Sequence, residues 1–433
     1  MRVTFYTLGC KVNQNETGAL AQLFEENGYT VVPNEEAADV YVVNSCTVTN
    51  FGDQKSRKWL RRAKRENPGA VTVLTGCYPQ AFPKEAAEIQ EADVVTGSGN
   101  RHAILADVTR VLNGEEARVV DIRPHQKGEK FEELPMDKFA EHTRAFVKVE
   151  DGCNRQCAYC VIPRARGPVR SRDEASILEE LRRLAAAGYK EVVLTAISLP
   201  SYGTDSGTSL VELIEKAAAV EGIERIRLGS LDPDMLHDEA ITRMAAVKKL
   251  CPQFHLSLQS GCDKTLRAMR RPYTTAQFAE IAAKLRAAFG EENVSFTTDV
   301  IVGFPGESEE DFEASMAFVT GQRFLKVHVF PYSRREGTPA YDFPGQLPEH
   351  EKENRSRRMT AAVEEVRAAE VTAMQGRTAS VLLETPLSAT LFTGYTKQYL
   401  PVRVSAPGHK TGDIVNVTLG AWDGRRCRAE LAK

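Results

Sequence analysis

The sequence predicts an α/β protein that ends in a small β domain. Three observations predict this class. Apolar runs rich in Val alternate with helical segments through the first third of the chain, a rhythm typical of a parallel sheet with helices on its faces. A second series of such units lies between residues 145 and 330. After Arg377, short β-like runs stand between Gly and Pro turns, which indicates a small β-barrel.

The first third, residues 1–120, is expected to form a doubly wound parallel sheet. Its expected strands are Val3–Thr7, Asp39–Asn44, Ala70–Thr75 and Asp93–Thr96. One helix is expected at Glu16–Asn27, closed by Gly28, and a basic helix at Lys55–Arg65. The basic helix is either a solvated charged helix or a contact for RNA phosphates.

A polar stretch with little periodicity, Asn113–Asp137, is interpreted as the connection to the second domain, with the linker at residues 121–138. The second domain is expected over residues 139–345. Its expected strands are Ala145–Val149, Glu191–Thr195, Arg225–Leu228, Phe254–Leu258, Ser295–Val302 and Lys326–Phe330. With helices between them, these strands predict an open or partial (β/α)6 barrel whose site lies at the carboxyl ends of the strands.

A charged helical segment, residues 346–376, is expected to connect the barrel to the tail at residues 377–433. The tail contains eight Lys or Arg and four Asp or Glu, a local charge of +4 against −3 for the whole chain. Tyr395, Tyr399 and Trp422 lie among these charges and could stack on bases. Charge and aromatics together favour an RNA-binding β domain over a purely stabilising appendage.

Composition limits the cellular context. The 433 residues suit two or three domains, and the slightly negative net charge gives no global sign of nucleic-acid binding. No apolar run reaches the length of a membrane span, and the nine residues before Cys10 are too short for a signal peptide. Nine cysteines in so long a chain do not indicate a disulfide scaffold. We therefore expect a cytoplasmic protein without a membrane partner.

A C-x3-C-x2-C run is the most informative motif of the chain. Cys153, Cys157 and Cys160 directly follow the first expected barrel strand. Soft thiolates select iron–sulfur clusters or zinc, and the next cysteine is as far away as Cys251. Three thiolates on a 4Fe-4S cluster leave one iron open for a ligand. The alternatives are three ordinary cysteines, or a zinc knuckle with a distant fourth ligand.

Three further cysteines occupy one topological position in the first domain. Cys10, Cys46 and Cys77 each follow an expected strand. Because parallel strands bring their carboxyl ends to one edge of the sheet, these residues are expected to converge there. A second three-cysteine cluster site follows from this topology. The alternative is that they are buried cysteines acting as small hydrophobic residues.

The first motif, with Tyr159 before its last cysteine, resembles the loop of the radical S-adenosylmethionine (SAM) superfamily. In that superfamily the open iron chelates SAM, and reduction releases a deoxyadenosyl radical. The two cluster motifs, the barrel and the basic tail together resemble the methylthiotransferases over essentially the whole chain. The tail resembles their TRAM domain, an RNA-binding β-barrel. The matching segments include Gly9–Gln14, Val43–Val48, Thr75–Cys77, Cys157–Gly167, Phe254–Asp263, Met269–Thr274 and His328–Ser333.

This resemblance implies two 4Fe-4S clusters and SAM as cofactors. Cys153, Cys157 and Cys160 would hold the cluster that cleaves SAM, and the N-terminal set would hold an auxiliary cluster that carries the sulfur. The implied partners are tRNA, SAM and a low-potential electron donor such as flavodoxin or ferredoxin. Candidates for the SAM pocket are Tyr159, Ser257, Gln259, Asp299, Ile301 and Gly303.

The implied reaction is methylthiolation of C2 of N6-threonylcarbamoyladenosine at position 37 of tRNA, next to the anticodon. The hydrogen on that carbon is hardly acidic, so a radical route suits it. Alternatives are the same chemistry on isopentenyladenosine in tRNA or on an aspartate of a ribosomal protein. A non-enzyme alternative is an iron–sulfur protein that binds tRNA or transfers electrons. One stretch, Ala196–Gly203, departs from the family pattern.

Overall fold

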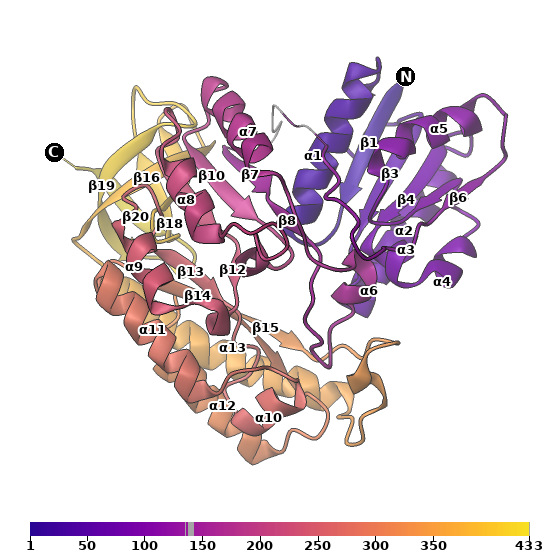
Figure 1. Ribbon diagram of the computed structural model, residues 1–433. Coiled ribbons are helices and arrows are strands. Elements are labelled where there is room, and N and C mark those ends of the chain that lie inside the picture. Colours follow the sequence, from indigo (N-terminus) through magenta and orange to yellow (C-terminus); the bar gives the residue numbers. More distant parts are fainter. Residues whose placement is uncertain (135, 137–142, 433) are drawn as a thin grey trace.

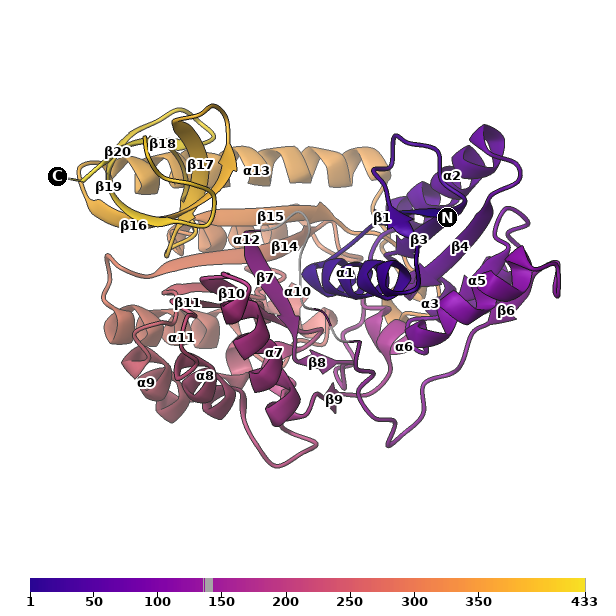
Figure 2. The same ribbon diagram turned by 90° about the horizontal axis from the view of Figure 1, so that it is seen from above.

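The computed structural model describes residues 1–134, 136 and 143–432. Residues 135 and 137–142, where the predicted linker meets the predicted barrel, and Lys433 of the predicted tail lie outside the described residues. The chain forms an N-terminal sheet, a central set of βα units and a C-terminal barrel (Figure 1). In Figure 2 the N-terminal sheet and the C-terminal barrel lie at opposite ends of the central units.

The N-terminal sheet has six parallel strands in the order β2-β1-β3-β4-β5-β6. The reversal of order at β1 is typical of doubly wound sheets. The strands are β1 (Arg2–Thr7), β2 (Thr30–Val31), β3 (Val40–Ser45), β4 (Val71–Gly76), β5 (Val94–Thr96) and β6 (Val119–Asp121). Helices α1 (Lys11–Glu26) and α5 (Ile104–Leu112) share a core on one face. Helices α2 (Asn50–Glu66), α3 (Cys77–Ala81) and α4 (Pro83–Ala87) cover the other. The predicted doubly wound sheet is confirmed.

Some boundaries differ from the prediction. Helix α1 begins at Lys11, five residues earlier than expected. Helix α2 begins at Asn50, because the Thr49 side chain accepts a hydrogen bond from the Gly52 N–H and caps the first turn. Strand β6 lies inside the stretch interpreted as a connection, and it pairs in parallel with β5. The sheet therefore uses part of that polar segment.

The central units form a series of parallel strands in two sheets, β11-β10-β7 and β12-β13-β14-β15. Strand β12 continues β11 after Gly229, so the two sheets follow one another. The strands are β7 (Arg144–Lys148), β10 (Glu191–Thr195), β11 (Arg225–Leu228), β12 (Ser230–Leu231), β13 (Gln253–Leu256), β14 (Ser295–Val302) and β15 (Lys326–Pro331). All six predicted strands are present, and the partial barrel is confirmed.

Helices and short elements surround these strands. They are β8 (Glu150–Asp151), α6 (Ile162–Arg166), β9 (Arg170–Ser171), α7 (Glu174–Ala186), η2 (Leu199–Ser201), α8 (Leu210–Ala218), η3 (Pro233–Met235), α9 (Asp238–Ala246), α10 (Asp263–Ala268), α11 (Thr275–Phe289), α12 (Glu309–Gly321), η4 (Pro339–Asp342) and α13 (Glu349–Thr372). The short helix η1 (Arg101–Ala103) belongs to the N-terminal part and contacts α1 and α5. At the two outer strands of the series, α1 packs on β7 and α13 packs on β15. Among the helices of the described residues, none is both long and apolar enough to cross a membrane.

The tail closes into a barrel in the order β16-β17-β18-β20-β19. Its strands are β16 (Thr378–Pro386), β17 (Leu391–Thr396), β18 (Pro401–Ser405), β19 (Ile414–Trp422) and β20 (Cys427–Leu431). The predicted β-barrel is confirmed: the β-like runs expected at Ser380–Leu383, Tyr399–Val404 and Ile414–Leu419 coincide with β16, β18 and β19, whereas β17 and β20 were not expected. Both additional strands are short, and each forms a ladder of hydrogen bonds with β18.

The turn between β17 and β18 closes the amino-terminal end of the partial barrel. Arg227, fully buried in β11, donates hydrogen bonds to the carbonyls of Thr396 and Lys397, at 3.2 and 3.0 Å. Ser295, the first residue of β14, donates to the Gln398 carbonyl at 2.6 Å. Because buried polar groups need partners, this turn satisfies donors that the barrel strands cannot satisfy themselves.

The tail aromatics take part in this closure. Tyr395 and Tyr399 stack on one another with ring centroids 4.5 Å apart. Arg144, at the start of β7, lies 5.1 Å from both rings, and Trp422 packs against Arg367 of α13. These contacts use part of each ring, and all three side chains are half-buried; stacking of these aromatics on RNA bases stays a prediction.

Candidate active site

The structure brings the strand ends that carry Cys10, Cys46 and Cys77 to one edge of the N-terminal sheet. The Leu8 N–H donates to the Asn44 carbonyl at 2.9 Å. A Cβ added at Gly9 would lie 2.9 Å from the Cβ of Cys46. The Ser45 hydroxyl donates to the Thr75 carbonyl at 2.6 Å. These contacts join the ends of β1, β3 and β4 directly, as the topology predicts.

Glycines with positive φ precede three of the six candidate cysteines. Gly9, Gly76 and Gly152 have φ of +105°, +96° and +96°, a region that side chains disfavour. Space is also short: a Cβ at Gly76 would lie 2.5 Å from the Asn44 side-chain oxygen, and one at Gly152 1.9 Å from the Pro168 carbonyl. Glycine is therefore required for the backbone to present these cysteines.

The loop Cys153–Cys160 follows β8 and is held by backbone hydrogen bonds at both ends. The Cys153 N–H donates to the Gly167 carbonyl at 3.0 Å, and the Ala158 N–H donates to the Met269 carbonyl at 2.9 Å. Within the loop, the Cys160 N–H donates to the Cys157 carbonyl at 3.1 Å. The loop thus lies near the carboxyl ends of the partial-barrel strands.

An arginine contacts one sulfur in each cysteine set. The Arg166 Nε–H donates to Cys77 Sγ at 3.1 Å, and an Arg271 guanidinium N–H donates to Cys157 Sγ at 3.2 Å. Such donors favour the thiolate over the thiol. The thiolate is the form that binds metal, so this arrangement fits a cysteine set that ligates iron.

Three of the thiols, those of Cys46, Cys153 and Cys160, would be protonated without a metal. Burial raises the pKa of Cys46 and of Cys160 to about 12 and that of Cys153 to about 11. A bound metal reverses this preference, because it binds thiolates and releases their protons. Across the described ranges, no group of three or more Cys, His, Asp or Glu side chains is arranged to share a single metal ion. In a 4Fe-4S cluster each thiolate binds a different iron, which does not require so close a group.

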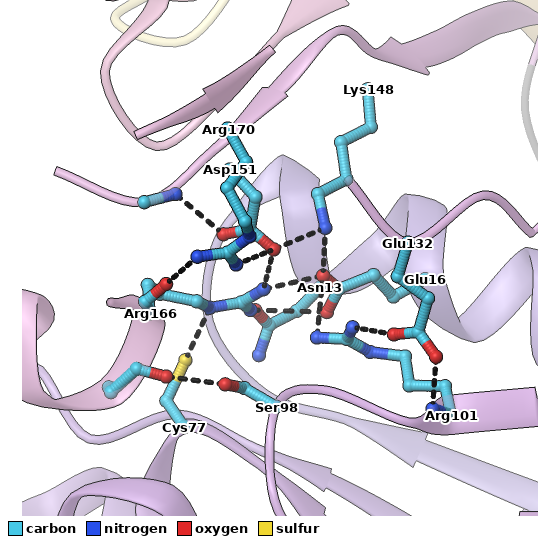
Figure 3. A network of polar contacts seen from close by, with 12 residues as sticks. Asn13, Glu16, Cys77, Ser98, Arg101, Glu132, Lys148, Asp151, Arg166 and Arg170 are labelled. Carbon is cyan, nitrogen blue, oxygen red and sulfur yellow. Dashed lines mark hydrogen bonds and ion pairs between the residues drawn. The ribbon is translucent and has the colours of Figure 1, made fainter. Parts of the chain in front are cut away.

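A buried ion network lies between the two sets (Figure 3). Glu16 of α1 contacts Arg101 at 2.8 Å, Lys148 of β7 at 2.7 Å and Arg166 of α6 at 3.1 Å. Burial alone would raise the pKa of Glu16, but these three cations lower it to about 2. Asp151 contacts Lys148 at 2.6 Å, and the surrounding cations hold its pKa well below the ordinary range. The network ties the N-terminal sheet to the segments on both sides of the cysteine loop.

A cavity of about 200 Å³ opens where the two halves of the site meet. It is lined by Val48, Thr49, Tyr159, Cys160, Val161, Ile162, Gln259, Asp299, Ile301, Phe330, Pro331, Tyr332 and Ser333. Val48 and Thr49 come from the segment after Cys46, whereas Tyr159 and Cys160 belong to the cysteine loop. Four of the six candidates for the SAM pocket line this cavity: Tyr159, Gln259, Asp299 and Ile301.

The other two candidates lie elsewhere. The Ser257 carbonyl accepts a hydrogen bond from the Tyr273 hydroxyl, close to Arg271. Gly303 packs beneath α13, where an added Cβ would lie 2.4 Å from Lys352 Cγ. Gln259 has a positive φ of 70°, and its backbone pairs with Asp299 and Ile301 at 2.9 and 2.8 Å. Such strained residues gather at functional sites.

Sequence reasoning missed several polar residues of this site. Arg166 and Arg271 lie within segments that resemble the family, but nothing in the local pattern pairs them with a sulfur. His255 contacts the Asp299 carboxylate at 3.3 Å and the Thr297 hydroxyl at 3.0 Å. Its position near the end of β13, opposite Thr297 of β14 and two residues before the level of Asp299, is the signal that could have indicated it.

The stretch Ala196–Gly203, which departs from the family pattern, supports the segment that leads into the cysteine loop. The Ser198 N–H donates to the Glu150 carboxylate at 2.8 Å. Burial raises the pKa of Glu150 well above its ordinary value. Tyr202 of the same stretch is buried. The stretch therefore helps to fix the position of β8, the strand that leads directly into the cysteine loop.

Comparison with known sequences gives two family matches. The family described as "Radical SAM superfamily" matches residues 147–319, and "Uncharacterized protein family UPF0004" matches residues 2–97. Among solved structures, the radical SAM methyltransferase TsrM from Kitasatospora setae is similar, with a TM-score of 0.58 at 14% identity. That alignment covers 78% of this chain and 74% of the other, and it shows a shared fold.

Curated relatives match nearly the whole chain. The threonylcarbamoyladenosine tRNA methylthiotransferase MtaB of Bacillus subtilis is 39% identical over 96% of this chain and 93% of its own. The protein of the same name from Aquifex aeolicus is 42% identical over 82% and 86%. A tRNA-2-methylthio-N(6)-dimethylallyladenosine synthase from Clostridium novyi is 34% identical over 95% and 92%. The chain belongs to the MtaB family of radical SAM methylthiotransferases.

Proposed function

We propose that this protein is a radical SAM enzyme that adds a methylthio group to C2 of N6-threonylcarbamoyladenosine at position 37 of tRNA. The observation that carries the proposal is the shared cavity, which is lined by Cys160 from one cysteine set and by the segment that follows Cys46 of the other. Similarity to relatives with this activity, over nearly the whole chain, supports the same substrate.

Each cysteine set has a proposed role. Cys153, Cys157 and Cys160 hold the cluster at which SAM is cleaved, and Cys10, Cys46 and Cys77 hold the auxiliary cluster. When bound, the first cluster supplies the electron for reductive cleavage of SAM and the second supplies the sulfur. Arg271 and Arg166 hold one thiolate of each set in place through the N–H contacts to sulfur.

The cavity residues have complementary tasks. Tyr159, Gln259, Asp299 and Ile301 form the wall that contacts SAM, whereas Ser257 and Gly303 support that wall from outside the cavity. Asp299, which lies 3.3 Å from His255, offers carboxylate oxygens to hydroxyl or ammonium groups. Apolar side chains such as Ile301, which also line the cavity, exclude water from a reaction in which a radical must meet an unreactive C–H bond.

The division of the chain into functional parts is also proposed. Residues 1–120 form the auxiliary-cluster domain, 121–138 the linker, 139–345 the radical SAM domain, 346–376 the connecting helix and 377–433 a TRAM-like RNA-binding domain. Arg425, Arg426 and Arg428 of the tail are exposed, which leaves positive charge available to tRNA phosphates. The proposed electron donor is a low-potential protein such as flavodoxin or ferredoxin, and the proposed location is the cytoplasm.

Mass spectrometry of tRNA nucleosides from a deletion strain tests the substrate. The strain should lose the 2-methylthio derivative of N6-threonylcarbamoyladenosine and accumulate its unmodified precursor, while the methylthio derivative of isopentenyladenosine persists. A plasmid copy of the gene should restore the product. Loss of only the isopentenyl derivative would assign the enzyme to the other nucleoside, and unchanged nucleosides would refute the proposed activity.

A further inference from the structure

The basic helix α2 presents a stripe of positive charge that the cofactor site does not use. Its exposed basic residues are Lys55, Lys58, Arg61, Arg62 and Arg65. The opposite face packs on the sheet through buried Ser56, Leu60 and Ala63. With 3.6 residues per turn, positions 55, 58, 62 and 65 lie on one side of the helix, about 5 Å apart along its axis.

The stripe starts beside the cavity. Helix α2 begins four residues after Cys46, and a Cβ added at Gly52 would lie 3.1 Å from the Cys46 carbonyl. Large apolar side chains gather at this end: Val48 is 55% exposed, Phe51 63% and Phe330 41%. Val48 and Phe330 also line the cavity. Val48, Phe51 and Phe330 therefore form an apolar rim beside the cavity, and the cations of α2 continue from this rim away from the site.

Part of this charge is available for a partner. Within the part of the chain that the structure describes, no carboxylate pairs with Lys55 or Lys58, and Lys55 lies over the Phe51 ring at 4.4 Å. Arg62 pairs with Glu66 at 2.9 Å and Arg61 with Glu91 at 3.0 Å. Exposed pairs of this kind contribute little to stability, so a polyanion can displace them.

We propose that the α2 stripe binds the sugar–phosphate backbone of the tRNA strand whose nucleotide enters the cavity, and that Val48, Phe51 and Phe330 contact its unstacked bases. This inference rests on the proposed function, in which tRNA is the substrate. Proteins recognise single-stranded RNA by combining a basic track for the phosphates with apolar or aromatic faces for the bases. The stripe and the rim combine these two features beside the cavity.

The shape of the stripe favours RNA over an acidic electron-donor protein. From Lys55 to Arg65 the cations extend over about 15 Å of helix, directed away from Cys46. A reductant needs its redox centre near a cluster, which calls for a compact patch around the site. A line of charges that leads outward from the cavity fits a linear polyanion that continues past the reacting nucleotide.

The test compares two double variants of the full-length, cluster-loaded protein. Lys55→Gln/Lys58→Gln removes two charges from the stripe. Arg182→Gln/Lys248→Gln removes two exposed charges from α7 and from the segment after α9, and both helices lie away from α2 (Figure 2). Binding of an anticodon stem-loop RNA is measured at several salt concentrations.

The stripe variant should bind the RNA more weakly at low salt. The magnitude of the slope of log affinity against log salt should fall by roughly 1.4 to 1.8, because each of the two lost phosphate contacts removes about 0.7 to 0.9. The control variant should keep the wild-type affinity and slope. Equal slopes in all three proteins would overturn the proposal.

A single variant tests the apolar rim. Phe51→Ala should weaken binding of the stem-loop about tenfold, since stacking of a base is lost, and should leave binding of an uninterrupted RNA duplex of equal length unchanged. Equal loss for both RNAs, or loss for neither, would overturn the role given to Phe51.

Two outcomes separate this inference from the proposed function. If the stripe variant binds RNA normally but is reduced more slowly by flavodoxin, the stripe docks a reductant; the inference then fails and the proposed function stands. If the stripe variant loses RNA binding while the wild-type protein forms no methylthio nucleoside, the inference stands and the proposed function fails.

Discussion

The two cysteine sets reach similar surroundings by different routes. Cys153, Cys157 and Cys160 come from one loop, whereas Cys10, Cys46 and Cys77 come from the ends of three strands of a sheet. In each set an arginine donates to one sulfur. Arg271 comes from the same partial barrel as its loop, but Arg166 crosses from the barrel segment to the N-terminal sheet.

This difference indicates what each site needs in order to assemble. The three cysteines of the loop are close together in the sequence. Their arrangement therefore depends mainly on the strand before the loop and on the hydrogen bond from the Ala158 N–H to the Met269 carbonyl. The N-terminal set exists only when the sheet has folded, and its arginine is in place only when the two domains have docked. The predictions below test whether the two sites are separable, beginning with the largest expected effect.

Replacing each cysteine set by alanine should separate the two activities. The variant without Cys10, Cys46 and Cys77 should hold about four irons instead of about eight, still cleave SAM to deoxyadenosine, and form no methylthio nucleoside. The variant without Cys153, Cys157 and Cys160 should form neither product. Deoxyadenosine and modified nucleoside are counted in the same reaction. Methylthio product from the first variant would show that the N-terminal cysteines are packing residues.

Arg166→Gln and Arg271→Gln should each weaken one site. Removing the Arg166 guanidinium takes a cation from the buried carboxylates Glu16 and Asp151, which should lower the free energy of unfolding by roughly 3–5 kcal/mol. Iron should be lost from the N-terminal set with Arg166→Gln and from the loop with Arg271→Gln.

Iron per chain, measured in backgrounds that lack the other cysteine set, distinguishes the two arginine effects. Arg166→Lys serves as the control, because it keeps the charge without the planar fork and should recover part of the lost stability. Equal iron loss from both sites in either variant would contradict the assignment of one arginine to each.

Glu16 should make the domain junction sensitive to acid. Its pKa is about 2 in the folded protein against 4.5 ordinarily. The stabilisation is therefore complete above pH 4.5 and is lost as the pH falls through about 2, which amounts to about 3 kcal/mol. Glu16→Gln should be less stable at pH 7 and should lose less stability between pH 5 and pH 2. Denaturant unfolding at several pH values measures this, and parallel curves for the two proteins would refute it.

Alanine at the glycines before the cysteines should have the smallest effect. Gly76→Ala and Gly152→Ala face both a positive φ and a steric contact, so we expect a loss of about 2–3 kcal/mol. Gly207 has φ of +78° with open space around it, and Gly207→Ala should lose only about 1 kcal/mol. Urea unfolding gives the three values. If the control lost as much as the others, the contacts near Asn44 and Pro168 would have no part in the effect.

The parallel strands were predictable because they are buried on both faces. All residues of β3 and β4 are buried, and each strand is rich in Val instead of alternating between apolar and charged residues. The cysteines could be placed because topology brings the carboxyl ends of such strands together. The three-cysteine loop carries its spacing within eight residues, which makes it visible without any structure.

The remaining features depend on contacts between distant residues. Strand β6 has only three residues and lies within a polar segment, so it could be identified only from its pairing with β5. The Arg166–Cys77 contact joins residues 89 positions apart, and a local sequence pattern cannot predict a partner at that distance. The tail aromatics illustrate the same limit: composition indicates that Tyr399 can stack, but only the structure shows that it stacks on Tyr395.

The turn that closes the amino-terminal end of the partial barrel has a consequence for biosynthesis. Arg227 leaves the ribosome about 170 residues before the carbonyls of Thr396 and Lys397 that accept its hydrogen bonds. Until the tail has been synthesised, the Arg227 guanidinium, which is fully buried in the finished protein, lacks these two acceptors. The partial barrel thus completes its hydrogen bonding at that end only after synthesis is nearly finished, and a premature stop codon in the tail would remove part of this closure together with the C-terminal barrel.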